Sequence, residues 1–518
     1  MTLRLRDTLR RSVEAVVLPD GPVRMYTCGP TVYRYAHVGN LRSYLLADLI
    51  RRSVRYHGRE VFHVKNITDV GHLRDERFDR GEDRMLVQAG LEDRSPAEIA
   101  QAYEAAFHAD EALVNILPAH VFPRATEHID DMVRFIERLE DAGYAYRSDS
   151  GNVYFAVSRS QGYGRLSGNS LDDLRAGHRG DVEPDKRDPA DFALWKAAGE
   201  GRLLKWPTDR YGEGFPGWHI ECSAMSLRYL GERFEIHTGG IDNVFPHHED
   251  EVAQSAALTG TVPAAHWVHG EFLQMAGRKM AKSAGNFQRI TELADAGIDP
   301  LAFRYLCLTV RYGRKLDYSA ASIRAAAAGL ESLRASVAAL GPVPPGTPWA
   351  PDPPIVAGRA PDRPTGIADA PTGHGDGIAP TLRDRAALPG LPFSRTGSEH
   401  HRRFVAAIDD DLDMPSALAT VRHTLRAGLD PDEARWLVLD ADQILGLDLH
   451  RSLQAGPADE LPGSVRARLE RRAVLRAAGD FAAADAIRED LAAEGWSLED
   501  GSEGTSTARR DRIGGDPD

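Results

Sequence analysis

Hydrophobic and polar positions near the start of the chain predict a strand, a helix and a second strand in succession. Residues 22–28 form a short apolar run, residues 42–56 place apolar side chains at helical spacing, and residues 59–65 form another apolar run. We expect this β-α-β unit to cross over right-handedly into a parallel sheet. Ligands favour the crevice at the carboxyl ends of such strands, where Cys28 and residues 66–69 would lie.

Helical patterns dominate the rest of the chain, with polar segments between them. Residues 72–84 are dense in Asp, Glu and Arg and predict a solvated loop, and residues 151–157 predict a strand among loops. Residues 341–400 are rich in Pro and Gly and predict a disordered insertion. Helical periodicity covers residues 96–144, 299–308, 320–340, 403–429, 432–445 and 462–494.

Composition is typical of a globular protein of several domains. At 518 residues the chain is too long for one compact core and should split into three or four units. No apolar run approaches the roughly 20 residues of a membrane span, and residues 1–7 lack the apolar region of a signal peptide. Three cysteines argue against a disulfide framework and for a reducing cytoplasm. The net charge of −14 gives no global attraction to nucleic acid, although it leaves room for a local basic surface.

The stretch from Tyr26 to Asn40 combines two kinds of candidate chemistry. It runs from the first strand through a Cys-Gly-Pro turn at Cys28 to a His-Val-Gly-Asn sequence ahead of the helix. Free backbone N–H groups and the helix dipole at such a turn favour an anion, which predicts a phosphate site. Cys28 places a candidate metal thiolate in the same turn.

Further metal-binding side chains follow in the segments 216–225 and 245–251. Together, Cys28, Cys222, His247 and Glu251 offer two thiolates, an imidazole and a carboxylate, a set acceptable to tetrahedral Zn²⁺. His247 and Glu251 would share one face of a helix beginning after Pro246, but His248 meets Glu251 at i+3, so spacing does not choose between the histidines. The chain has no CxxC pair, and a metal-free core of buried cysteine and hydrogen-bonded histidine is the alternative.

A basic loop bounded by glycine lies further along the chain. Residues 277–286 read Gly-Arg-Lys-Met-Ala-Lys-Ser-Ala-Gly-Asn, with Lys279 and Lys282 three positions apart. Ammonium groups on a mobile loop suit a transferring phosphate chain, whose charge they offset in the transition state. A solvated basic loop is the commoner interpretation of one such motif without further context.

Five motifs resemble those of one known family, and they follow one another along the chain in that family's order. The His-Val-Gly-Asn sequence from His37 resembles the HIGH signature of class I aminoacyl-tRNA synthetases, with Asn40 in place of the last His. Lys-Met-Ala-Lys-Ser from Lys279 resembles their KMSKS signature, with Ala281 in place of the first Ser. Three motifs look specifically like cysteinyl-tRNA synthetase: Cys-Gly-Pro-Thr-Val-Tyr from Cys28, Gly-Trp-His-Ile-Glu-Cys-Ser-Ala-Met from Gly217, and Pro-His-His-Glu-Asp-Glu from Pro246. The similarity runs from about residue 20 to 340 and from 400 to about 505.

This resemblance implies a fold and a division into domains. We expect an α/β fold with a Rossmann-type parallel-sheet catalytic domain at 1–315. The expected parts are an insertion within that domain at about 110–205, a helical connection at 316–340, the disordered insertion at 341–400, a helical DALR-like tRNA-binding domain at 401–455, and a small C-terminal anticodon-binding region with a frayed tail at 460–518. A cytoplasmic monomer is expected.

The resemblance also implies a reaction and its residues. L-Cysteine would attack the α-phosphate of ATP, which Mg²⁺ accompanies, and the cysteinyl-adenylate would pass to the 3′ end of tRNA(Cys). One zinc per chain would bind the cysteine thiolate, a far better zinc ligand than a hydroxyl or an apolar group, so that no editing domain is needed. By the same matching, the zinc ligands would be Cys28, Cys222, His247 and Glu251. The cysteine pocket would comprise Cys28, Gly29, Thr68, Trp218, His237 and Asp242, ATP would meet His37, Gly39, Asn40 and Lys282, and the catalytic residues would be His37, Asn40, Lys279 and Lys282.

Two alternatives keep the fold and change the function. A paralogue of the mycothiol-pathway ligase type would activate cysteine with the same zinc and pass it to a small amine. The helical regions 403–445 and 464–494 argue against it, because an amine ligase needs no tRNA-binding appendage. The second alternative is a catalytically silent RNA-binding homologue, against which the complete set of candidate ligands argues.

Overall fold

A computed structural model gives the fold as two compact units, each assembled from separate stretches of the chain. It describes residues 3–71, 73–75, 80–170, 185–199, 202–275, 278–279, 288–342, 393–454, 463–477, 479–494, 496–500 and 506–510. The first unit comprises Met1–Tyr35, Arg59–Ala106 and Ala119–Glu271, and the second comprises Ala36–Gly58, Phe107–Pro118 and Phe272–Asp518. These units do not coincide with the catalytic domain expected at 1–315, because residues 36–58 pack with the C-terminal half of the chain.

The central sheet of the first unit is parallel, as the β-α-β pattern predicts. Its order is β13-β12-β3-β4, and every neighbouring pair is parallel. The strands are β3 (Val23–Thr27), β4 (Val61–Lys65), β12 (Phe234–Gly240) and β13 (Ala264–Gly270). All residues of β12 are buried, as in a strand that is covered on both faces. The prediction of an α/β fold built on a parallel sheet is confirmed.

Three helices of the first unit pack against one another and build its core: α4 (Ile129–Asp141), α6 (Trp218–Leu230) and α7 (Glu249–Thr259). The buried residues of α4 recur at helical spacing, which gives the helix one apolar face. That face belongs to a single hydrophobic core together with residues of the central sheet, including Tyr26, Phe234 and Trp267. The core therefore lies directly beside the strand end that carries Cys28.

A second, antiparallel sheet of the first unit occupies much of the insertion expected at 110–205. Its order is β10-β11-β9-β8-β7. The strands are β7 (Ala145–Arg147), β8 (Val153–Phe155), β9 (Phe192–Ala197), β10 (Trp206–Thr208) and β11 (Gly212–Pro216). The sheet continues past residue 205, and β11 leads through Gly217 directly into α6. The last strand of this sheet in the sequence, β11, is therefore followed directly by the helix that carries Cys222.

One polar segment of the first unit is more ordered than its composition predicts. The expected loop 72–84 contains two paired strands, β5 (Leu73–Asp75) and β6 (Arg80–Asp83). Asp83, the last residue of β6, is buried, and its carboxylate caps α2 (Arg84–Glu92) by accepting the N–H groups of Met85 and Leu86. The other elements that lie wholly in this unit are β1 (Arg4–Asp7), β2 (Ser12–Ala15), η2 (Ala125–His128), η3 (Val157–Arg159), η4 (Ile241–Asn243) and η5 (Val244–His248), and α3 (Pro96–Leu113) begins in it.

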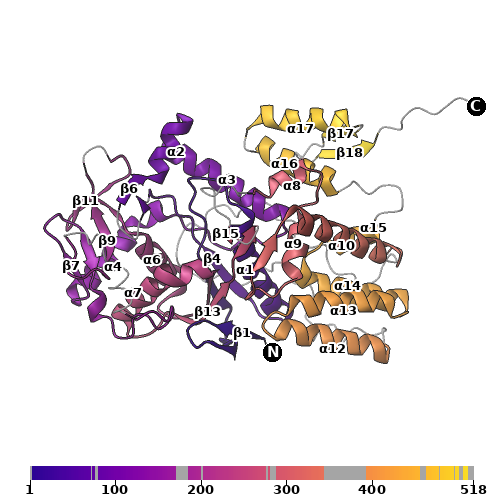
Figure 1. The fold of residues 1–518 in the computed structure, drawn as a ribbon, viewed down its shortest axis with the longest axis horizontal. Helices are drawn as coiled ribbons and strands as arrows, with labels where there is room; N and C mark the ends of the chain where they lie inside the picture. Colours follow the sequence, from indigo (N-terminus) through magenta and orange to yellow (C-terminus); the bar gives the residue numbers. More distant parts are fainter. Residues whose placement is uncertain are drawn as a thin grey trace, which may run out of the picture. The chain divides into compact units, whose positions relative to one another are not determined.

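The second unit contains the long helix α1 (Val38–Tyr56), further helices and a small sheet (Figure 1). In that sheet, β14 (Leu273–Met275) pairs with β15 (Arg278–Lys279) and with β16 (Leu316–Tyr318). The helices are α8 (Thr291–Asp295), α9 (Leu301–Leu308), α10 (Ala320–Ala338), α12 (Arg395–Asp409), α13 (Met414–Arg426), α14 (Pro431–Leu445) and α15 (Leu449–Gln454). Because α12 begins at Arg395, the insertion expected at 341–400 ends earlier, and its residues 343–392 lie outside the described residues.

The C-terminal part of the second unit forms a small core of its own. Helices α16 (Gly463–Ala477) and α17 (Phe481–Ala493) pack together, and β17 (Trp496–Asp500) follows them. Val465, Leu469, Leu491 and Trp496 are its buried centre. The expectation of a frayed tail is wrong for β18 (Ser506–Arg510), which pairs along its whole length with β17.

A buried polar cluster joins α1 to the later helices of the second unit. Arg304 on α9 is fully buried and donates to Asp48 on α1 at 2.7 Å and to the carbonyl of Asn115 at 2.8 Å. It also donates to the carbonyl of Leu445, the last residue of α14. Arg52 donates to the same Asp48 carboxylate at 2.8 Å. Burial raises the pKa of Asp48, but the two arginines and the N–H of residue 117 outweigh it and lower that pKa below its ordinary value.

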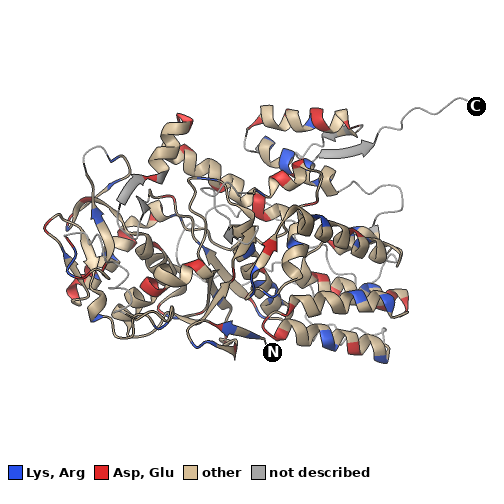
Figure 2. Cartoon of the chain, in the orientation of Figure 1, with Lys and Arg blue, Asp and Glu red and all other residues tan. Residues whose placement is uncertain are grey.

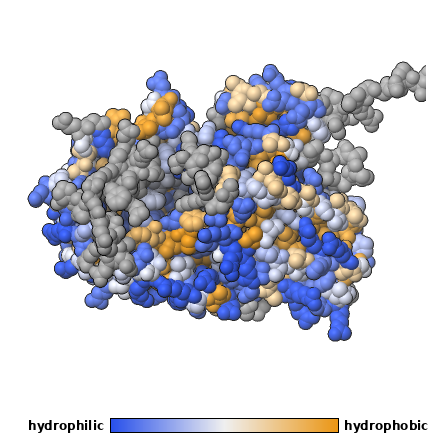
Figure 3. Space-filling view, viewed as in Figure 1, coloured by the Kyte–Doolittle hydropathy of each residue, from blue (hydrophilic) through white to orange (hydrophobic). Residues whose placement is uncertain are grey.

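The surfaces of both units are mixed in charge and in hydropathy. Figure 2 shows basic and acidic positions interspersed along α12, whereas the charged positions of α13 are all basic. The face drawn in Figure 3 mixes hydrophobic and hydrophilic residues, and on α2 the side chains of Val87 and Leu91 are exposed. Among the described residues, none of the helices combines the length and the apolar character that crossing a bilayer requires.

Candidate metal centre

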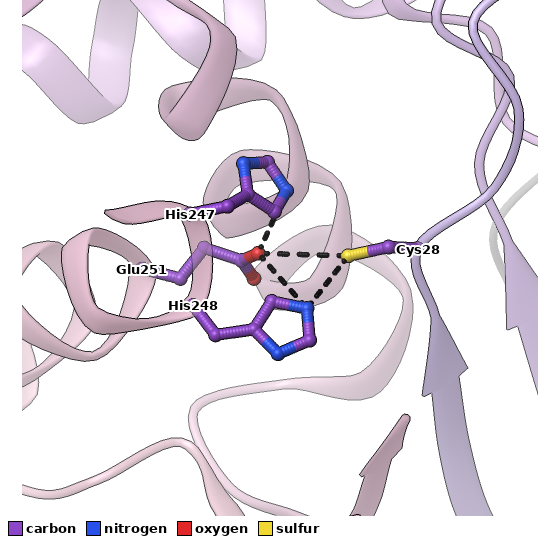
Figure 4. Close-up of side chains that lie close together, drawn as sticks. All are labelled: Cys28, His247, His248 and Glu251. Carbon is purple, nitrogen blue, oxygen red and sulfur yellow. Dashed lines mark hydrogen bonds and ion pairs between the residues drawn. The ribbon is translucent and has the colours of Figure 1, made fainter. Parts of the chain in front are cut away.

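Three elements of the first unit bring metal-binding side chains together. Cys28 follows the carboxyl end of β3, His247 and His248 lie in the wide turn η5, and Glu251 lies in the first turn of α7. All four side chains are buried and point toward one another (Figure 4). The expected helix beginning after Pro246 is thus a wide turn followed by α7, and it brings both histidines to Glu251.

The donor atoms are as close as ligands of one ion would be. Sγ of Cys28, a ring nitrogen of each histidine and a carboxylate oxygen of Glu251 all lie within 4.8 Å of one another. Nε2 of His248 is 3.1 Å from the Cys28 sulfur, and Nε2 of His247 is 3.1 Å from Oε1 of Glu251. A thiolate, imidazoles and a carboxylate at such spacing form a donor set suited to Zn²⁺.

Cys222 lies beside this group without belonging to the mutually close set of four. Its sulfur, carried by α6, is 3.8 Å from the sulfur of Cys28 and 3.7 Å from Oδ1 of Asn66. Of the four ligands implied by the resemblance, Cys28, His247 and Glu251 fall within the close group, and Cys222 contacts it through Cys28. His248, which spacing left open, is the fourth member.

The electrostatics of the group suit a cation. Burial is the main cause that raises the pKa of the Cys28 thiol well above its ordinary value, with Cys222 adding to the shift. Burial likewise raises the pKa of Cys222 to about 11 and lowers that of His248 well below its ordinary value. A divalent cation reverses the preference of the two thiols, because a coordinated thiol is deprotonated outright, while the neutral imidazole that burial favours at His248 is already the form that ligates a metal. The residues present therefore fit a zinc ion.

Further histidines hold the donor side chains in place. His237 on β12 contacts Oε2 of Glu251 through Nε2 at 2.9 Å, and its ring stacks on Trp267 with centroids 4.4 Å apart. Nδ1 of His248 lies 2.7 Å from Nε2 of His269, and Nδ1 of His247 lies 3.0 Å from Nδ1 of His219. Such partners fix the orientation of ligand rings. Sequence reasoning missed His219 and His269. His219 is three residues before Cys222 in the same motif, and His269 is near the carboxyl end of β13, so position was the available signal.

The remaining residues expected in the cysteine pocket differ in their burial and in their contacts. Thr68 is buried and donates from its hydroxyl to Glu221 at 2.9 Å. Trp218 begins α6, and its ring centroid is 4.4 Å from that of His247. Asp242 differs, because it lies exposed on η4 after β12.

Gly29 lies where no side chain fits. Its N–H donates to Oδ1 of Asn66 at 2.9 Å, and a Cβ added to it would meet the carbonyl oxygen of Asn66 at 1.6 Å. Gly29→Ala should therefore destabilise the protein by about 2 kcal/mol, since the clash is with backbone and forces strands apart. Urea unfolding measures the loss. Gly21→Ala is the matched control, because a Cβ there meets nothing within 4 Å, and equal stability of the two variants would contradict the predicted clash.

The candidate ATP-binding residues belong to the second unit. His37 is the N-cap of α1: its Nδ1 accepts the N–H of Asn40, and the Asn40 side chain accepts the N–H of His37, both at 3.1 Å. This reciprocal capping box fixes both side chains at the helix N-terminus, with Gly39 between them. Lys279 lies on β15, and Lys282 lies outside the described residues.

Proteins of known name are similar to this chain over most of its length. A family model for the class I (C) tRNA synthetase catalytic domain matches residues 14–328. Cysteine–tRNA ligase 1 of Burkholderia lata is 40% identical over 508 residues, which cover 97% of this chain and 96% of the relative. The cysteine–tRNA ligase of Chromohalobacter salexigens is 38% identical and covers 97% of this chain and 99% of its own. The fold is similar to that of Mycobacterium tuberculosis methionyl-tRNA synthetase in complex with methionyl-adenylate, with a TM-score of 0.52, 15% identity, and coverage of 84% of this chain and 91% of that one.

Proposed function

Because the chain belongs to the cysteine–tRNA ligases, a family of class I tRNA synthetases, we propose that it activates L-cysteine with ATP and transfers it to the 3′ end of tRNA(Cys). The observation that carries this proposal is the buried convergence of Cys28, His247 and Glu251, on a chain similar over nearly its full length to proteins of that name. These donors suit the recognition of a thiol through a metal.

Cys28, Cys222, His247 and Glu251 would hold one zinc ion in the first unit. When bound, zinc supplies a soft acceptor for the thiolate of the substrate, which a hydroxyl or an apolar side chain cannot match. The chain's own contribution is orientation. His237 holds Glu251, and Gly29 removes the side chain that would otherwise fill the space beside Asn66. Trp218 and Thr68 would line the pocket, whereas Asp242 would meet substrate from its exposed position.

ATP, accompanied by Mg²⁺, would bind at the N-terminus of α1. The capping box presents His37 and Asn40 at the positive end of the helix dipole, which favours the phosphates. Gly39 lets the nucleotide approach the backbone, and Lys279 and Lys282 would offset the charge on the pyrophosphate leaving group. In this scheme, positioning and charge stabilisation do the chemistry, and no residue becomes covalently attached to substrate.

The helical regions at 401–455 and 460–518 would bind tRNA(Cys). This assignment distinguishes the proposal from its closest alternative, transfer of activated cysteine to a small amine. Incubation with ATP, labelled cysteine and either tRNA or candidate amines tests it. Label should enter acid-precipitable tRNA, and adenylate formation with transfer to an amine and none to tRNA would overturn the proposal.

Alanine replacements separate the two adjacent histidines. His247→Ala should lower zinc affinity by more than about 100-fold because it removes a ligand, whereas His248→Ala should lower it by about 10–100-fold because it removes a partner of the ligands. Competition with a chromogenic chelator measures both affinities. The opposite order would reassign the imidazole ligand to His248, whose Nε2 is 3.1 Å from the Cys28 sulfur.

A further inference from the structure

One arginine ties α1 to the small sheet of the second unit. Arg42 lies in the second turn of α1, and its side chain is buried. Its Nη1 donates to the carbonyl of Phe272 at 2.7 Å, and its Nη2 donates to the carbonyl of Arg314. Phe272 comes directly before β14, and Arg314 comes two residues before β16. The guanidinium of Arg42 therefore bonds to the chain at the start of both paired strands and attaches the two strands to α1.

The strands that Arg42 holds set the position of Lys279. The carbonyl of Phe272 also accepts the N–H of Leu316 at 3.2 Å, so Arg42 binds where β14 and β16 meet. β14 pairs in turn with β15, in a register that places Gln274 opposite Lys279. The backbone of Lys279 is thus two hydrogen-bonded steps from α1.

The chain that follows Lys279 is also hydrogen-bonded to the first turn of α1, at Gln288. The N–H of Val38, directly after His37, donates to the carbonyl of Gln288 at 3.0 Å. Residues 280–287 lie outside the described residues. The first two turns of α1 therefore contact the chain before Lys279, through Arg42, and after Lys279, through Val38.

We propose that Arg42 is a positioning residue that holds the strands carrying Lys279 in place against the helix end carrying His37 and Asn40. This inference rests on the proposed function, in which those side chains meet one ATP molecule. Arginine suits the task because its planar fork donates to two acceptors in fixed directions, whereas the ammonium of lysine is a point charge on a flexible stem. A misplacement of about 1 Å between groups that act together can cost about 100-fold in rate.

Arg52 provides a matched control on the same helix. The side chains of Arg42 and Arg52 are equally buried, with residue exposures of 6% each. Arg52 also makes a full set of hydrogen bonds, to Asp48 and to the carbonyls of Asn115 and Gln443. None of these partners belongs to the small sheet or its flanks. Loss of the Arg52 fork therefore costs packing and hydrogen bonds without releasing β14 and β15.

The test compares Arg42→Lys with Arg52→Lys in the full-length, zinc-loaded protein. Cysteine-dependent ATP–pyrophosphate exchange gives kcat and the KM values for ATP and cysteine, and urea unfolding gives stability. Arg42→Lys should raise the KM for ATP about tenfold and lower kcat by about 10–100-fold, while zinc content and the KM for cysteine stay unchanged. Arg52→Lys should lose similar stability and change the KM for ATP less than about twofold.

Equal kinetic effects of the two variants would overturn the role of Arg42 and leave a purely structural arginine. If Arg42→Lys does not fold, Arg42→Gln, whose amide can still donate to one carbonyl, takes its place with the same expected split. Calorimetric titration with ATP alone tests Arg42 independently of the amino acid, and weaker ATP binding by the Arg42 variant is expected there too. A wild-type protein that binds ATP but shows no cysteine-dependent exchange would overturn the proposed function instead.

Discussion

Cys28→Ser is expected to remove zinc from the protein and to raise the KM for cysteine by more than about 100-fold, because replacing mere partners of ligands already costs about 10–100-fold in metal affinity. A serine hydroxyl keeps the shape of the side chain and loses the soft donor. His248 and Glu251 then lose the Cys28 sulfur, which lies 3.1 Å from Nε2 of His248 and 3.7 Å from Oε1 of Glu251. Atomic absorption after dialysis measures zinc, and cysteine-dependent ATP–pyrophosphate exchange measures the KM.

Cys307→Ser is the control for this substitution. Cys307 is the third cysteine of the chain and lies on α9 in the second unit, among residues that take no part in the donor group. Its replacement should leave zinc content and the KM for cysteine unchanged. Full zinc occupancy in Cys28→Ser would refute the ligand assignment, and zinc loss in both variants would point to general damage from losing a thiol.

Arg304→Met is expected to lower the free energy of unfolding by about 3 kcal/mol, because removal of one member of a buried ion pair leaves the other charge poorly compensated. Asp48 would keep Arg52 and lose its second guanidinium. The carbonyls of Asn115 and Leu445 would also lose a buried donor. Urea unfolding measures the change.

A surface arginine calibrates that measurement. Arg324 is exposed on α10, so Arg324→Met should change the free energy of unfolding by less than about 0.5 kcal/mol. A loss below about 1 kcal/mol in Arg304→Met would mean that the cluster contributes little net stability, as happens where the desolvation of buried charges cancels their attraction.

The spacing of apolar and polar residues was sufficient to predict the elements whose structure depends on neighbours in the sequence. The strand ending before Cys28 and the helix after His37 follow from apolar spacing and the Gly/Pro turn between them. The i and i+4 spacing brought His247 and Glu251 together even though the turn η5 replaced the expected helix start. Composition failed at residues 72–84, where the polar side chain of Asp83 caps a helix instead of facing solvent.

Long-range pairing could not be predicted in the same way. Periodicity identified α1 as a helix, but it carries no information about which other segment covers that helix. Arg304 and Asp48 are ordinary charged residues in the sequence, and their mutual burial depends on backbone carbonyls from two further segments. The choice between His247 and His248 also depends on ring orientations that only the packed site defines.

The assembly of the second unit from distant stretches has a consequence for the chain as the ribosome makes it. Asp48 and Arg304 are 256 residues apart, a distance that takes about 10 to 50 s to translate at typical rates of about 5–20 residues per second. During that interval the nascent α1 has left the exit tunnel with Arg52, while Arg304, the second arginine that pairs with its buried aspartate, has not yet been synthesised. The helix with the His37 signature therefore waits for the C-terminal half before it can be buried, which makes nascent or truncated chains candidates for chaperone binding.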